Sequence, residues 1–435
     1  MKKYGIKAPE QLTSKKPLQS SYRPQFNYPE IKKPYVLDFE SKLLILDNES
    51  YNLGQINPLK GAKVNWLGVN DSITSLSNSQ GITNSPFLLH HSSVFIVEKK
   101  GYIPAIGYAI AGELSLVMLE KTSRLKPILN SLEISFEHNK TQLIFGRVFD
   151  AQLKPAADMT LESLSGNKNQ VFYSSGSLTL FNKNTQQTGS SGEFLALSDG
   201  EDFFHFTAQK KSNKEKWSDQ IISLFKKYPV LSFTFVEGFQ NKFEAAFVDA
   251  YTRSEIENEA FVLVGKNSQM ETQNRDGLFD FSFKSPRNNV LDMQFFTKGY
   301  LKTTLHHNGK ELHTPEDVFA FTPKHIKRIL GYRSASNRSY IFGQLRKDIY
   351  EESVKIRIYD SIGREYTRAR VHYFNQNNVT HHELDRTHPD QQNFAISLLP
   401  SGQWTVVVMD EEESELLSSQ VVRIYGNRTV SQILF

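Results

Sequence analysis

The chain has 435 residues, a length that suits roughly three to five domains of about 100 to 150 residues each. It contains 31 Phe and 18 Tyr, enough large apolar side chains for several packed cores. It contains no Cys, which excludes disulfides, thiolate metal ligands and cysteine nucleophiles.

The formal net charge of +4 is unevenly placed along the chain. Residues 1–35 hold eight Lys or Arg and two Glu, a balance of +6, which leaves 4 − 6 = −2 for everything after Tyr35. The remainder is nearly neutral, whereas a nucleic-acid-binding protein carries a basic face on its folded domains. We therefore expect no nucleic-acid partner.

Residues 1–35 are also rich in Pro, which blocks both helices and sheet ladders, so we expect an extended basic tether. Three roles remain open for it: a solvated leader, a strap that docks on a neighbouring subunit, or a segment that lies along an anionic membrane or wall surface.

The N-terminus MKKYGIKAPE lacks the apolar core of a signal peptide, and the sequence has no run of about 20 apolar residues. Either the protein is cytosolic or the chain starts after a removed export signal. The architecture argued below favours the second interpretation. We therefore expect an extracytoplasmic location, in the periplasm or at the cell surface, with membrane contact only through an anchor or the tether.

The stretch from Asn274 to Thr303 shows best how the chain is built. Phe279, Phe281 and Phe283 alternate with polar residues, which predicts a strand with one buried face. A turn then leads to the apolar run VLDMQFF, a second strand that ends before Gly299.

Segments similar to this unit recur at an interval of about 100 residues. If Gly146, Ala246 and Gly343 are equivalent, the offsets between them are 100 and 97 residues. Each unit divides into short segments of period two separated by turn residues, which predicts an all-β chain of tandem antiparallel β-sandwiches. We expect a tether at 1–35 and sandwiches at 36–130, 131–228, 229–330 and 331–435. The helical segments that we expect, near Lys214–Lys227 and Pro315–Leu330, lie between units.

The pattern of an Asp-Ala strand end, a turn with Gly and a final Gly-Tyr resembles the carboxypeptidase regulatory-like domains, transthyretin-like members of the immunoglobulin-type sandwiches. The third unit carries the pattern through Val248, Asp249, Ala250, Asp276, Gly277, Phe279, Gly299 and Tyr300, and the first through Gly81, Gly101 and Tyr102. The second and fourth units match at fewer positions. The resemblance implies non-catalytic spacer, binding or assembly domains.

The same residues have a structural interpretation that does not depend on the resemblance. Gly101 and Gly277 suit positions that need a positive φ. Tyr102 and Tyr300 can bury a ring while the hydroxyl caps a loop, as in the tyrosine corner of sandwiches.

The richest polar cluster is THHELDRTHPD, whose candidate metal ligands are His381, His382, Glu383 and His388. Imidazole and carboxylate groups at these distances could bind a divalent ion if the loop folds on itself. The spacing fits no standard zinc motif, so we interpret the segment as a solvated loop and predict neither a metal nor another cofactor.

Other polar motifs also favour structural interpretations. The HxxE of His313 and Glu316 lacks the α/β catalytic domain that a metallocarboxypeptidase needs. The neighbours His306 and His307 face opposite sides of a strand, as do His90 and His91. The acidic run 410–413 is a candidate Ca²⁺ site or, as we expect, a hairpin tip.

These observations predict four tandem β-sandwiches arranged as a rod or curved array. The expected function is non-enzymatic: a structural or docking protein of a bacterial envelope or surface assembly, with a protein partner. The alternative is a carbohydrate-binding protein that recognises cell-wall or surface polysaccharide, and a metal-dependent hydrolase that uses the loop at 381–390 is a third possibility.

Overall fold

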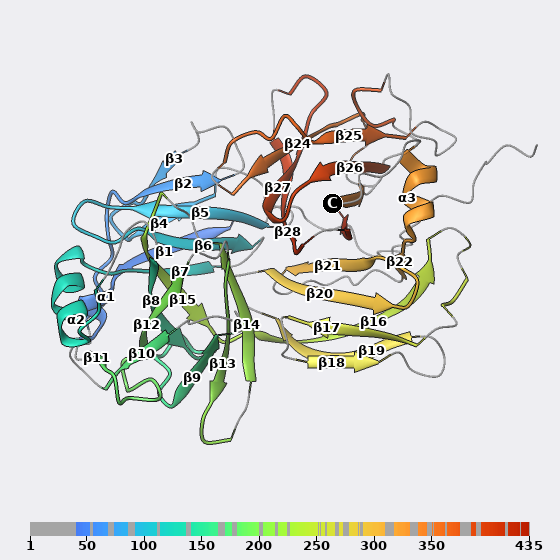
Figure 1. Cartoon of the computed structure of the whole chain (residues 1–435). Coiled ribbons are helices and arrows are strands. Elements are labelled where there is room, and N and C mark those ends of the chain that lie inside the picture. Colours follow the sequence, from blue (N-terminus) through green and yellow to red (C-terminus); the bar gives the residue numbers. More distant parts are fainter. Residues whose placement is uncertain are drawn as a thin grey trace, which may run out of the picture.

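The computed structural model of the chain describes residues 41–52, 55–67, 74–85, 92–110, 114–135, 141–163, 170–175, 181–199, 203–213, 216–223, 227–250, 252, 254–256, 259–265, 269–272, 278–285, 287, 290–308, 317–330, 338–345, 350, 352–361, 363–374, 384–388, 393–413, 416–426 and 428–434. The predicted tether lies outside these residues. Within them the fold is all-β, as predicted, and four sandwiches lie at the corners of a rough square (Figure 1).

The first two sandwiches occupy the blue and green half of Figure 1. The elements of the first are β1 (Lys42–Asp47), α1 (Asn48–Asn52), β2 (Lys63–Leu67), β3 (Thr74–Leu76), β4 (Ile82–Asn84), β5 (Ser92–Glu98), β6 (Ala105–Ile110), β7 (Leu114–Leu119), the 3₁₀-helix η1 (Thr122–Arg124) and α2 (Leu125–Ser131). Those of the second are β8 (Thr141–Phe149), β9 (Met159–Ser163), β10 (Gln170–Ser174), β11 (Phe181–Asn182), β12 (Glu193–Asp199), β13 (Phe203–Lys210), β14 (Lys216–Ser223) and β15 (Val230–Val236).

The other two sandwiches occupy the yellow and red half. The elements of the third are β16 (Phe239–Asp249), β17 (Ala260–Val264), β18 (Gln269–Thr272), β19 (Leu278–Ser285), β20 (Val290–Thr297), β21 (Lys302–Asn308), β22 (Asp317–Ala320) and α3 (Pro323–Leu330). Those of the fourth are β23 (Ser339–Gln344), β24 (Lys355–Asp360), β25 (Arg370–Tyr373), β26 (Asn393–Leu399), β27 (Gly402–Met409), β28 (Leu416–Ile424) and β29 (Thr429–Leu434).

Two long sheets each run through a pair of sandwiches. The first has the order β11-β10-β12-β8-β15-β6-β5-β2-β3, and the second has the order β18-β17-β20-β21-β29-β23-β26-β25. Three-stranded sheets complete the sandwiches: β4-β1-β7, β14-β13-β9, β19-β16-β22 and β24-β27-β28. We call residues 41–236 the first module and residues 239–434 the second module.

Alternation of apolar and polar residues builds the core of the third sandwich. Phe279, Phe281 and Phe283 are at most 6% exposed, whereas Asp280 and Ser282 between them are exposed. Phe279 packs edge-on against Phe295 of β20, and neighbouring rings of β16 extend the cluster. Each buried ring contributes about 1.5–3 kcal/mol of hydrophobic free energy.

The last strand of each module pairs with strands of two sandwiches. The expected boundary at 229 puts β15 in the third sandwich, but β15 pairs in parallel with β8 of the second sandwich and β6 of the first. Likewise β29 pairs with β23 of the fourth sandwich and also with β21 of the third. Both strands are largely buried, so each needs neighbours on both edges to satisfy its backbone groups.

Both helix predictions were wrong in part. Residues 216–223 form strand β14, which pairs with β13 along its length. The spacing of apolar residues in this segment is compatible with either a helix or a strand, and the pairing decides between them. In Pro315–Leu330, residues 317–320 form strand β22, since Val318 and Ala320 belong to the third core. The helix begins at Pro323, where Thr322 accepts a hydrogen bond from the backbone N–H of His325.

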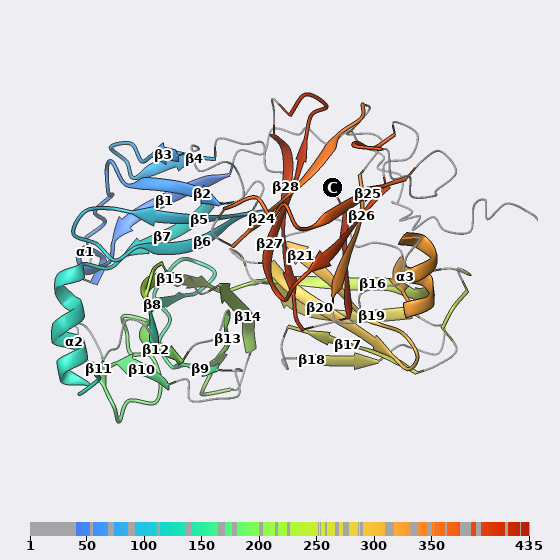
Figure 2. The same cartoon turned by 45° about the horizontal axis from the view of Figure 1, so that its top comes forward.

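The prediction of a rod or curved array was wrong. Strand β28 of the fourth sandwich lies against β5 of the first, and the hydroxyls of Ser93 and Ser419 are 2.8 Å apart. The chain therefore closes on itself, as both views show (Figures 1 and 2). The sequence did not reveal this closure because it depends on side chains on the outer faces of sheets, which look like ordinary strand residues.

Candidate functional site

The predicted corner residues lie where a strand of the first sandwich and a strand of the third sandwich end. Tyr102 donates a hydrogen bond to Asp47 Oδ2 at 2.7 Å, and Tyr300 donates one to Asp249 Oδ2 at 2.8 Å. Here the first and third sandwiches are called A-type because they share this corner. The two aspartates also cap the turn that follows, because their Oδ1 atoms accept backbone N–H groups. These contacts hold loops in place.

The predicted glycines have the backbone conformation that such corners require. Gly101 and Gly299 have φ values of 87° and 91°. Gly81 has a φ of 72°, and a Cβ atom there would lie 2.5 Å from the carbonyl oxygen of Ile45, so no larger residue fits without a shift. Gly277 lies outside the described residues.

We expect Tyr300→Phe to lower the free energy of unfolding by about 1–2 kcal/mol, because Asp249 loses a hydrogen-bond donor in a partly buried corner. Urea unfolding measures the change. Tyr366→Phe is the control, since the hydroxyl of Tyr366 has no hydrogen-bond partner in the described part of the chain. Equal losses in both variants would contradict a specific role of the corner.

The predicted metal candidates are not brought together in what the structure describes. His381, His382 and Glu383 lie outside the described residues, and His388 is partly buried. The neighbouring Thr387 holds its segment against β24, because its hydroxyl accepts a hydrogen bond from the N–H of Val354 at 3.0 Å. Within the described ranges, no three His, Asp or Glu side chains are grouped as metal ligands.

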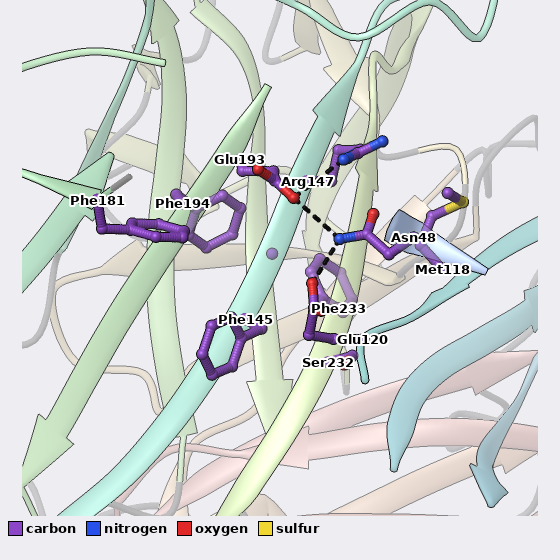
Figure 3. A pocket seen from close by; sticks show the side chains of 11 residues that line it. Asn48, Met118, Glu120, Phe145, Arg147, Phe181, Glu193, Phe194, Ser232 and Phe233 are labelled. Carbon is purple, nitrogen blue, oxygen red and sulfur yellow. Dashed lines mark hydrogen bonds and ion pairs between the residues drawn. The ribbon is translucent and has the colours of Figure 1, made fainter. Parts of the chain in front are cut away.

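A buried ionic cluster, not predicted from the sequence, joins the first sandwich to the second (Figure 3). We call it the junction cluster; its members are Asn48, Glu120, Arg124, Arg147 and Glu193. Each is at most 8% exposed. The first three come from the first sandwich, at the starts or ends of α1, β7 and η1, and the other two come from β8 and β12 of the second.

Glu193 is the centre of this cluster. Its Oε1 atom accepts hydrogen bonds from Arg147 at 3.0 Å and from Asn48 at 3.0 Å, and Arg124 lies 3.4 Å away. Asn48 also donates to Glu120 at 2.6 Å, and Arg124 donates to the same oxygen of Glu120 at 2.7 Å. Two arginines and two carboxyl groups thus meet across the boundary between two sandwiches.

The cavity beside the junction cluster is small. It measures about 10 Å³, which is room for roughly one water molecule, and Met118, Phe145, Phe181, Phe194 and Phe233 form its apolar wall (Figure 3). A space of this size cannot hold an organic substrate. The junction cluster therefore acts as a connection between sandwiches.

Burial raises the pKa of Glu120 to about 7 from an ordinary value of 4.5, although Arg124 acts in the opposite direction. The folded chain thus holds this proton more tightly than the unfolded chain does. The contribution of Glu120 to the free energy of unfolding is therefore fully present below about pH 4.5 and is lost as the pH rises from there through 7, by at most about 3 kcal/mol.

We expect Glu120→Gln, which cannot ionise, to remove this fall. Urea unfolding at pH 5 and pH 8 compares the variant with the parent chain. Glu413→Gln is the control, because Arg357 and Lys355 lower the pKa of Glu413 and it stays ionised across this range. If Glu120→Gln loses as much stability as the parent between the two pH values, the assignment to Glu120 is wrong.

A second buried cluster ties together the first, third and fourth sandwiches. We call it the Arg423 lock; its members are Arg423, Asp292, His306, Tyr425, Gln403 and Tyr108. The guanidinium of Arg423 is fully buried, 3.3 Å from Asp292 Oδ2, and donates to the carbonyl oxygen of Val290 at 2.8 Å. It also lies over the ring of Tyr108, 5.2 Å from the centroid.

The other members complete the lock around Asp292. His306 Nδ1 lies 2.7 Å from Asp292 Oδ1, and the hydroxyl of Tyr425 donates to Oδ2. Burial acts to raise the pKa of Asp292, but Arg423 and His306 outweigh it and lower the pKa to about 2. Tyr108 of the first sandwich donates to Gln403 of the fourth at 3.1 Å. The lock therefore fixes three sandwiches relative to one another.

Sequence reasoning missed both clusters, although it contained a signal for one. Asp292 is the single charge within VLDMQFF, and Arg423 stands among apolar residues in QVVRIYG. A charged residue in the middle of an apolar strand indicates a buried ion pair. The partner could not be read from the sequence, because the two residues are 131 positions apart.

No protein-family model matches the chain, and no curated protein sequence matches it. Among solved structures, a streptococcal ancillary pilin matches with 12% identity and a TM-score of 0.21, over 65% of this chain and 99% of that one. The Bacillus anthracis TIE protein has 11% identity and a TM-score of 0.17, over 88% and 69%. BcpA, the major pilin subunit of Bacillus cereus, has 11% identity and a TM-score of 0.17, over 65% and 99%.

These TM-scores are too low to indicate a shared overall arrangement. In the described ranges no helix has the length and apolar character needed to cross a membrane. The architecture therefore follows from the strand pairing: the protein is an all-β chain of tandem β-sandwiches joined by shared sheets.

Proposed function

We propose that the protein is a non-enzymatic structural or docking component of a bacterial envelope or surface assembly. The observation that carries the proposal is the closure of four sandwiches into one block. Shared sheets join them in pairs, and the junction cluster and the Arg423 lock hold buried charges at the boundaries. A block of this kind keeps distant surfaces at fixed positions, which suits a spacer or docking part.

The first sandwich is where we expect the protein partner to bind. Among the described residues, the exposed large apolar side chains are Ile56, Leu76 and Leu114, and all three belong to this sandwich. Leu76 is 66% exposed on β3, the outermost strand of the nine-stranded sheet. An edge strand with an exposed apolar residue can pair with a strand of a partner.

A photo-crosslinking residue at position 76, in cells that make the protein, tests this proposal. We expect one envelope or surface protein to be captured at near-stoichiometric yield. Arg370, exposed on β25 at the edge of the other long sheet, is the matched control position and should capture much less. Recovery of the chain in the cytosol, or equal unspecific capture at both positions, would contradict the proposal.

A binding measurement on the purified chain distinguishes the carbohydrate alternative. Trp66 and Trp404 are buried at 2% and 5% exposure, so neither is an open platform for a sugar ring. Saturable binding of wall or surface polysaccharide by the purified chain, without a captured protein, would replace the docking proposal with the carbohydrate-binding one.

A further inference from the structure

The two modules have the same construction. The strand order of the first long sheet from β10 to β3 matches the strand order of the second long sheet from β25 to β18. In this match β15 corresponds to β29, and both strands pair in parallel with their neighbours. The three-stranded sheets correspond as well: β4-β1-β7 to β19-β16-β22, and β14-β13-β9 to β28-β27-β24. Within the described residues, β11 alone among the strands has no counterpart.

Individual side chains repeat along with the strands. In β8 a Cβ atom on Gly146 would lie 1.9 Å from the ring of Phe194, and in β23 a Cβ atom on Gly343 would lie 2.1 Å from the ring of Phe394. Each glycine thus makes room for a Phe on the neighbouring strand. The two B-type sandwiches, the second and fourth, share this detail.

A second detail unites the B-type sandwiches. Tyr173 accepts a hydrogen bond from the N–H of Leu161 at 2.8 Å, and Tyr373 accepts one from the N–H of Ile356 at 2.9 Å. In addition, the β13–β14 and β27–β28 hairpins both shift register before their last residue pair. With the Asp–Tyr corner of the A-type sandwiches, the order along the chain is A-B-A-B.

The contacts between the modules are reciprocal. Strand β28 of the second module lies against β5 of the first, and β14 of the first module lies against β20 of the second. Since β28 corresponds to β14 and β5 to β20, the two contacts are the same contact made twice. This is the arrangement of a twofold symmetric dimer, and the diagonal placement of like sandwiches in Figures 1 and 2 agrees with it.

The A-type sandwiches present equivalent faces at these contacts. Tyr108 and His306 both lie six residues after the corner tyrosines, since 108 − 102 and 306 − 300 both equal 6. Strand pairing then makes Val94 equivalent to Asp292. We call these faces the pairing faces; that of the first module is Val94, Ile96, Ile106 and Tyr108, and that of the second module is Asp292, Gln294, Thr304 and His306.

The two pairing faces differ in chemistry. The first is apolar and belongs to one buried cluster with Val290 and Val421 of the second module. The second is polar, and Arg423 pairs with its Asp292 while covering Tyr108 of the first. The position of β14 that corresponds to Arg423 is Ser223, as the paired registers of the two hairpins show. An unlike pair of modules therefore gains a buried contact that two first modules lack.

We propose that the chain is a duplicated two-sandwich module and that its pairing faces form a recognition surface whose partner is a second copy of the module. Here that copy is supplied by the same chain. The Arg423 lock favours this unlike pair over a pair of two first modules, which have Ser223 at the position of Arg423.

The test cuts the connection between the modules in the full-length chain. A flexible insert with a protease site after Gly238 separates β15 from β16. We expect the two halves to co-elute at the volume of the intact chain after cleavage. Because the chain has no Cys, Ser93→Cys with Ser419→Cys adds a second measurement, in which oxidation should link the two halves on a non-reducing gel.

Tyr108→Leu tests whether association of the two halves depends on the contact between the modules, because it leaves Asp292 and Arg423 paired within the second module. We expect it to weaken association of the cleaved halves at least tenfold. Arg364→Ala, at an exposed ion pair with Asp360, is the control and should leave association unchanged. Halves that separate on cleavage, or an unlinked cysteine pair, would overturn the proposal.

Discussion

Arg423→Ala is expected to lower the free energy of unfolding by about 3–5 kcal/mol, the largest effect of a single substitution in the second module. The carboxylate of Asp292 is 1% exposed, and without Arg423 it is buried with only His306 and Tyr425 as partners. The truncation also uncovers the ring of Tyr108 at the boundary with the first module. Urea unfolding, followed by tryptophan fluorescence, measures the loss.

Arg364→Ala is the matched control, because Arg364 also pairs with an aspartate but is 70% exposed. We expect the unfolding midpoint of this control to stay close to that of the parent. Asp292→Val with His306→Tyr, which copies the first module, should recover part of the loss when combined with Arg423→Met, since no buried charge is left unpaired. Equal stability of Arg423→Ala and Arg364→Ala would contradict the structural role of the lock.

Glu193→Ala is also expected to lower the free energy of unfolding by about 3–5 kcal/mol. It leaves Arg147 and Arg124 as buried cations, with Glu120 as the one remaining carboxylate of the cluster. The first and second sandwiches meet at the junction cluster, so we also expect removal of the Glu193 carboxylate to weaken the contact between them. Amide hydrogen exchange should then rise in β8 and β12 before the chain unfolds globally.

Glu133→Ala is the control for this variant, because Glu133 pairs with Lys183 at the surface and is 82% exposed. It should leave both the unfolding midpoint and the exchange rates of β8 unchanged. If Glu193→Ala behaves like this control, the junction cluster does not hold the two sandwiches together.

The second module shows that the fold does not require the junction cluster. At the position equivalent to Glu120, counted from the paired strands β1 with β7 and β16 with β22, it has Phe321. Phe321 stacks on Phe342 with the ring centroids 4.6 Å apart. Buried charged side chains thus fill the boundary between the two sandwiches of the first module, and aromatic rings fill the equivalent boundary in the second module.

The individual sandwiches could be predicted because their signals are local. The spacing of Phe279, Phe281 and Phe283 depends only on which face of a strand is buried, and the corner tyrosines follow a turn that needs glycine. The all-β fold class and the tandem units follow from repeated signals of this kind.

The arrangement of the sandwiches could not be predicted because it depends on contacts between distant residues. Strand β15 is buried on both faces, including its polar residues Ser232 and Thr234, and nothing in VLSFTFV says whether it pairs forward with β16 or backward with β8. Arg423 and Asp292 each appear as an isolated charge until the fold brings them together. The pairing faces look like ordinary outer faces of strands, so the closed square was missed.

Small-angle X-ray scattering of the full-length chain tests the central claim most directly, which is that the four sandwiches form one closed block through paired modules. A compact chain of 435 residues has a radius of gyration of about 22 Å, and we expect a value within a few ångströms of this. Four separate domains of about 100 residues in a row would give roughly 40 Å, and a value near that would contradict the closed arrangement.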